Sequence, residues 1–265
     1  MASHRVLACA FALLIAAPVA CGQAEPTPSI RFDGNGALSD AQLLAETGAP
    51  PVDGDPRGWA ERGSLMLSAA YFDAGYLQAR VDGPRIEAHR EGTPRWVVHI
   101  DENVRFRLAT IEVVELDGAG VAGVPRIDAA ALAPIRARAG SWFDRSALMR
   151  ELGAIQTAYK DLGYADVEAP PELALDAARA EARVSIHIRP GPLVHIERID
   201  VAGAPELSDA IRGDFELGPG DLFNETKLSR RLDKVRARPG LGRVDMSTSH
   251  AAPDRLVLTV EASVR

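Results

Sequence analysis

The chain has 265 residues, of which 46% are hydrophobic and 25% are charged, so it has the composition of a globular protein with room for two or three small domains. Its formal net charge is −7. Nucleic-acid binding needs clustered cations, so this balance gives no reason to expect a nucleic-acid partner, and it argues against a broad basic surface for anionic lipid.

The N-terminus has the pattern of an export signal. An apolar run over 6–19 is too short to span a membrane comfortably. Small residues precede Cys21 at its end, which resembles a bacterial lipobox, although Pro18 stands where a branched aliphatic residue is usual. The sequence therefore predicts a signal peptide over 1–20, lipidation of Cys21 and a tether over 21–28.

The alternative is ordinary cleavage near Ala24, which would leave a soluble chain with an unpaired thiol. A free thiol in an oxidising compartment is a liability, which favours acylation. No cysteine follows Cys21, so we expect no disulfide in the folded part.

The first structural repeat is predicted over 29–103. A short strand leads to a helix over 40–46, for which Ser39 is the expected N-cap. A second helix follows over 57–74.

Two strands complete this repeat. The first covers 77–89 and is interrupted at Gly83-Pro84, which suits an edge strand because proline lacks the N–H that a ladder requires. The second is indicated by alternation of the apolar residues Trp96, Val98 and Ile100.

The pattern recurs over 104–191 at an offset of about 88 residues, which suits tandem small domains. One face of the second helix is apolar, and Gly163 ends that helix because glycine takes the left-handed cap conformation without steric cost. A strand over 165–175 is broken by Pro170-Pro171. The apolar positions of the helix and of the closing strand are Leu148, Leu152, Ile155, Tyr159 and Leu162, then Val184, Ile186 and Ile188.

A looser third copy covers 192–265. It contains a short helix over 208–215 with Ser208 as the expected cap, a helix over 225–238 capped by Asn224, and a final hairpin over 243–249 and 255–261. It lacks the Gly-Tyr pair that the other copies have at Gly75-Tyr76 and Gly163-Tyr164, where Tyr71 and Tyr159 precede the pair at matching positions.

These repeats resemble the polypeptide-transport-associated (POTRA) domain. The resemblance implies an α+β fold of three tandem β-α-α-β-β domains, each a three-stranded mixed sheet with two helices on one face. The family's domains precede a membrane β-barrel in outer-membrane assembly proteins, and we expect none here because the sequence stops at 265. The resemblance rests on Tyr159, Gly163, Tyr164, Ile188, Gly191, Ile196, Ile199, Val201 and Gly203.

The sequence indicates no catalytic chemistry. Of the six histidines, His4 lies in the predicted signal peptide and the others lie on or at the start of predicted strands, without the helical spacing of a zinc site. The glycines over 118–123 fit dinucleotide-loop spacing, but Val124-Pro125 follows, so no helix opens there to bind a pyrophosphate. We expect no enzyme activity, cofactor or metal site.

The resemblance implies a periplasmic scaffold or chaperone-like module at the outer membrane. It would bind a β-barrel assembly protein or unfolded outer-membrane clients by adding a strand to the edges at 78–89, 165–175 and 243–249. The alternatives are a soluble periplasmic location and a cell-envelope or division scaffold. Representative contact positions are Val81, Arg85, Val167, Glu172, Val244 and Met246.

Overall fold

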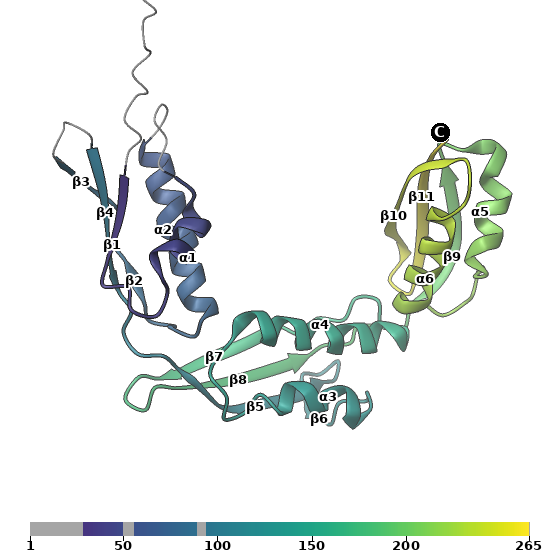
Figure 1. The fold of residues 1–265 in the computed structure, drawn as a ribbon. Helices are drawn as coiled ribbons and strands as arrows, with labels where there is room; N and C mark the ends of the chain where they lie inside the picture. The colour runs from purple at the N-terminus through teal and green to yellow at the C-terminus, as the bar shows by residue number, and fades with distance from the viewer. Residues whose placement is uncertain (1–28, 50–55, 89–93, 265) are drawn as a thin grey trace, which may run out of the picture.

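The computed structural model describes residues 29–49, 56–88 and 94–264. Figure 1 shows them as three successive units, each of sheet and helix. The predicted signal peptide, the tether and Cys21 lie outside the described residues. None of the helices within the described ranges is both long enough and apolar enough to cross a membrane.

The first unit has a mixed sheet in which β4 is central. The strand β1 lies parallel to β4, whereas β2 and β3 pair with β4 in antiparallel fashion. Ser39 caps the first helix, as predicted, and the structure adds a capping box with Gln42. The elements are β1 (Ser29–Asp33), α1 (Asp40–Thr47), α2 (Pro56–Asp73), β2 (Arg80–Val81), β3 (Arg85–Ala88) and β4 (Pro94–Asp101).

The second unit repeats this topology with an extra two-residue strand. Its sheet order is β6-β5-β8-β7, with β5 and β8 parallel and the outer pairs antiparallel. Asp128 and Asp144 cap its helices. The elements are β5 (Arg107–Leu116), β6 (Ala122–Gly123), α3 (Ala129–Arg136), α4 (Arg145–Asp161), β7 (Pro171–Asp176) and β8 (Glu181–Ile188).

The third unit has the sheet order β10-β11-β9, with β9 parallel and β10 antiparallel to the central β11. The predicted cap at Ser208 is wrong. A 3-10 turn precedes α5, so Ser208 is already inside the helix and no side chain caps it. The elements are β9 (His195–Ala202), the turn η1 (Pro205–Leu207), α5 (Ser208–Phe215), α6 (Glu225–Arg236), β10 (Leu241–Ala252) and β11 (Arg255–Val264).

Each sheet buries one face against its two helices, which confirms the predicted α+β class (Figure 1). In β8 the alternation is clear: Val184, Ile186 and Ile188 are buried, and the residues between them reach the surface. The apolar face of α4 packs on this sheet with Leu152 and Ile155. Burial of these stripes supplies the main folding drive of each unit.

Candidate functional site: free strand edges and the joints between units

The predicted edge strands all lie at the border of a sheet. The segment expected over 77–89 is split into β2 and β3, as the glycine and proline between them predicted, and both pair on one side only, with β4. The strand β7 borders the second sheet and β10 borders the third. A border strand presents unpaired N–H and C=O groups that can accept a further strand.

The second edge is shorter than its prediction. Strand β7 begins at Pro171, and within 165–170 only Glu168 forms a bridge, with Arg189. Two successive prolines cannot donate to a ladder, which delays the start of the strand. Leu173 and Leu175 are 37% and 40% exposed at this border.

Two of the six predicted contact residues are exposed at edge positions, and a third is half-buried at an edge. Arg85 on β3 is exposed, whereas Val81 on β2 is half-buried opposite Ile100 and packs against the core of the first unit. Glu172 on β7 is exposed and lies 3.6 Å from the imidazole of His187.

The other three lie in or against the cores of their units. Val167 and Val244 are only 7% and 4% exposed and belong to the cores of the second and third units, so they cannot offer side chains to a partner. Alternation along β10 turns the Val244 side chain toward the helices, whereas Val167 lies before the start of β7. Met246 is half-buried beside the third core. A binding role for the six residues stays a prediction.

Strand β10 is the longest of the free edges, with 12 residues against 6 in β7 and 4 in β3, and its sequence contains no proline. The carbonyl of Val244 accepts a hydrogen bond of 3.2 Å from Nε of Arg236, so it faces away from β11. Outward-facing groups recur every second residue in an antiparallel strand, which turns the backbone of Met246 and Thr248 toward the same open side.

The two joints between units share one construction, built on the helix-ending glycines. The Phe106 amide donates a hydrogen bond of 2.9 Å to the Gly75 carbonyl, and the Val194 amide donates one of 2.9 Å to the Gly163 carbonyl. Both glycines have positive φ, +94° and +100°. A Cβ on Gly75 would lie 2.6 Å from the Phe143 carbonyl oxygen. The Gly-Tyr signature therefore marks the place where one unit meets the next.

Side chains reinforce the first joint. An ion pair of 3.1 Å links Asp73 at the end of α2 to Arg145 at the start of α4. The rings of Phe72 and Phe143 meet edge to face with centroids 5.6 Å apart, so an apolar contact also crosses the joint.

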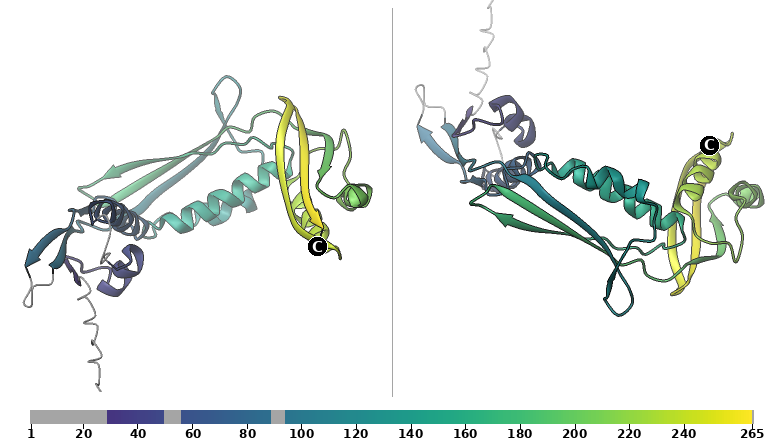
Figure 2. Two further views of the ribbon diagram at one scale, coloured as in Figure 1. Left: turned by 90° about the horizontal axis from the view of Figure 1, so that it is seen from above. Right: turned by 90° about the horizontal axis from the view of Figure 1, so that it is seen from below.

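The second joint is more polar. Asp161 accepts bonds from the Thr226 amide and hydroxyl at 2.8 and 2.7 Å, and Lys160 pairs with Glu225 at 2.9 Å. Figure 2 shows α4, in teal, running from the first unit to the third, so one helix carries both joints. Such an arrangement holds the three units as a connected array.

A His–Asp contact also crosses the second joint. Nε2 of His250 on β10 lies 2.9 Å from Asp166 of the second unit. The hydrogen bond to the Asp166 carboxylate raises the pKa of His250 above its ordinary value.

The signature tyrosines form hydrogen bonds with carboxylates in their own units. Tyr159 donates a hydrogen bond of 2.6 Å to Glu115. Glu115 also accepts a hydrogen bond from the backbone amide of Arg126 and forms an ion pair with the Arg126 guanidinium. Burial works against ionisation of Glu115, but the bonds from Tyr159 and Arg126 hold its pKa below the usual range. Tyr71 makes the same contact with Glu102 at 2.9 Å. These pairs join the helix to the sheet rather than create a reactive group.

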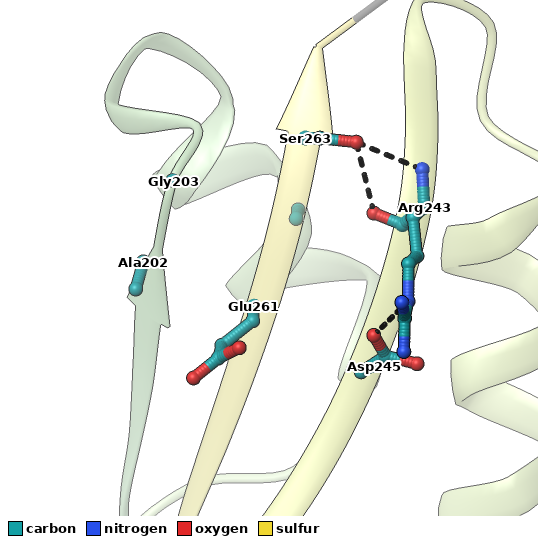
Figure 3. Close-up of a pocket in the computed structure, with 7 residues that line it drawn as sticks. Ala202, Gly203, Arg243, Asp245, Glu261 and Ser263 are labelled. Atoms are coloured by element: carbon teal, nitrogen blue, oxygen red, sulfur yellow. Dashed lines mark hydrogen bonds and ion pairs between the residues drawn. The ribbon is translucent and has the colours of Figure 1, made fainter.

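A hollow of about 490 Å³ lies at the end of the third sheet, between Gly203 and Arg243. Figure 3 shows the Arg243 side chain turned to Asp245, at 2.5 Å, and the Arg243 amide bonded to Ser263 at 2.9 Å. Its cation is thus already paired, and the hollow is open and shaped by the strand ends.

The chain resembles known proteins over most of its length, although no protein-family model matches it. The outer membrane protein assembly factor BamA of Neisseria meningitidis serogroup B is 22% identical over 259 residues, which cover 92% of this chain and 32% of that protein. BamA of Nitratidesulfovibrio vulgaris is 23% identical over 221 residues, which cover 81% and 24%. The chain thus spans about a third or less of these relatives.

A comparison of folds also finds BamA. The crystal structure of Haemophilus influenzae BamA POTRA3-5 superposes with a TM-score of 0.63 at 16% identity, over 89% of this chain and 95% of that one. The repeated strand–helix–helix–strand order, the shared mixed sheets and the sequence matches agree. This chain is homologous to BamA and is built from POTRA-type folds.

Proposed function

We propose that the chain is a non-enzymatic scaffold or chaperone-like module that binds polypeptides during outer-membrane protein assembly or translocation. Its homology to proteins named as outer membrane protein assembly factors supports the process. The free edges of its three sheets support the mechanism. The three units act as separate domains, with boundaries at 29–103, 104–191 and 192–265.

Binding takes place by strand addition. A client segment in extended form pairs its main chain with a border strand, and each such hydrogen bond contributes a net ~0.5–1.5 kcal/mol. Main-chain bonds tolerate many sequences, which suits a module that handles varied clients. The free edge of β10 is the strongest support for this mode of binding, because it is the longest and has no proline.

The partners are a separate outer-membrane assembly protein or unfolded outer-membrane proteins, and the chain works at the periplasmic face of the outer membrane. Lipidation at Cys21 would tether it there. Replacement Cys21→Ser tests the anchor: incorporation of labelled palmitate and retention in the membrane fraction should both disappear. Retention without the cysteine would contradict a lipid anchor.

Site-specific photocrosslinking in cells tests the binding mode. A photoreactive residue at Arg85, Glu172 or Met246 should label outer-membrane protein precursors or an assembly protein. The matched control is Leu65, which is 72% exposed but lies on the helix α2 and not on a strand. Equal labelling from Leu65 and from the edge positions would contradict strand addition, and labelling of septal proteins alone would favour a division scaffold.

A further inference from the structure

A hollow of about 220 Å³ opens beneath the free edge of β10, where the third unit meets the second. Its floor is apolar: Phe223, Leu228 and Leu256 are at least nine-tenths buried, and Met246 adds a half-buried thioether. A cavity of about 150 Å³ holds one benzene molecule, so this hollow has room for one large side chain.

The rim of the hollow is charged but internally neutralised. Lys160 pairs with Glu225 at 2.9 Å, and His250 with Asp166 at 2.9 Å. A charged side chain entering the hollow would lose its hydration without gaining an unpaired counter-charge. The site therefore favours a neutral apolar side chain over a charged one.

The position of the hollow along β10 matches the open backbone. Met246, Thr248 and His250 line it. The outward Val244 carbonyl implies that the backbone groups of Met246 and Thr248 also face the free border. The accessible part of this border is limited at both ends. At one end Arg236 hydrogen-bonds the Val244 carbonyl, and at the other the His250 side chain contacts Asp166. In a strand added to β10, the residue opposite Thr248 turns its side chain to this same face.

We propose that this hollow is a side-chain pocket that selects, from an extended polypeptide added to β10, a segment with one large neutral apolar residue opposite Thr248. The inference rests on the proposed strand addition and adds a preference that main-chain pairing alone lacks. The second unit contributes Lys160, Ala165 and Asp166 to the pocket, so the site is complete only when the two units are joined.

Nuclear magnetic resonance titration of the purified full chain tests this pocket. The probes are two blocked seven-residue peptides of alternating threonine and serine, flanked by lysines for solubility, with phenylalanine or alanine at the centre. The phenylalanine peptide should shift the amide signals of Met246 and Thr248 and bind about tenfold more tightly, as expected for partial burial of one aromatic side chain.

A variant that fills the pocket provides a second test. Ser229→Phe places a ring in the hollow from the exposed face of α6 and should reduce the phenylalanine peptide to the affinity of the alanine peptide, which should not change. Ser247→Phe is the matched control, because Ser247 is exposed on the opposite face of β10 and should leave both affinities unchanged.

The outcomes separate the two ideas. Equal affinities of the two peptides, with shifts at Met246 and Thr248, overturn the pocket and leave strand addition standing. No shift on β10 with either peptide overturns strand addition at this edge together with the pocket. Tighter binding of the phenylalanine peptide that Ser229→Phe leaves intact also overturns the assignment, since the ring would then lie elsewhere.

Discussion

The joint between the first two units depends on the absence of a side chain at Gly75, and Gly75→Ala tests this. Its φ of +94° costs an alanine roughly 1–2 kcal/mol. The new Cβ would also lie 2.6 Å from the Phe143 carbonyl oxygen, which is backbone and cannot rotate away. Such overpacking costs roughly 1–3 kcal/mol, so the total is about 2–5 kcal/mol.

Gly140→Ala is the matched control. Its φ is +83°, close to that of Gly75, but no atom lies within 4 Å of the position that a Cβ would take. The two variants therefore share the backbone penalty of about 1–2 kcal/mol and differ in the steric contact at the joint.

Amide hydrogen exchange at Phe106 is the assay, because that amide donates to the Gly75 carbonyl. If the extra 1–3 kcal/mol opens the joint, exchange at Phe106 should be roughly 5- to 150-fold faster in Gly75→Ala than in Gly140→Ala. The exchange rate of the Val194 amide, at the second joint, should be the same in both variants. Equal exchange at Phe106 in the two variants would refute the proposed contact.

Three further changes probe the remaining contacts. Tyr159→Phe leaves Glu115 without its 2.6 Å donor and should cost ~1–3 kcal/mol, seen as a lower calorimetric melting temperature; an unchanged transition would show that the bond contributes nothing. Asn224→Ala removes the N-cap of α6 and a 2.8 Å bond to the Asp161 carbonyl, so it should lose about 0.5–2 kcal/mol from the cap alone in chemical denaturation, and full stability would contradict the capping role. Because contact with Asp166 raises the pKa of His250, its stabilisation of the second joint is fully present below the ordinary value near 6.5 and is lost as pH rises through the raised pKa. Small-angle scattering should thus report a looser array at pH 8 than at pH 6, and His250→Gln should remove the difference; pH-independent profiles of the unaltered chain would contradict this.

Local periodicity accounts for the elements that were predicted correctly. The apolar stripe of α4 and the alternation in β8 follow from side-chain spacing over a few residues, which the sequence displays directly. The interruption between β2 and β3 follows in the same way from one glycine and one proline, since the missing N–H is a property of the residue itself.

The direction of the side chains at the edges was harder to predict from the sequence. Val167 and Val244 were predicted as contact residues, and both are core residues. The segment predicted over 243–249 does lie on a border strand, but the face on which the Val244 side chain falls depends on strand register, and a shift of one residue reverses it. Val167 lies before the start of β7. The start of β7 at Pro171 and the bulges in β10 fix that register, and both arise from pairing with distant strands.

Local sequence patterns were enough to predict the three repeats, their helices, the glycines that end those helices and the prolines that interrupt the edges, because each depends on neighbours within a turn or a strand. The folded chain was needed to show that the Gly75 and Gly163 carbonyls join successive units, that Tyr159 bonds Glu115, and that Asp166 contacts His250. Those contacts link residues 31 to 84 positions apart, and nothing in a local pattern specifies which distant group will meet which.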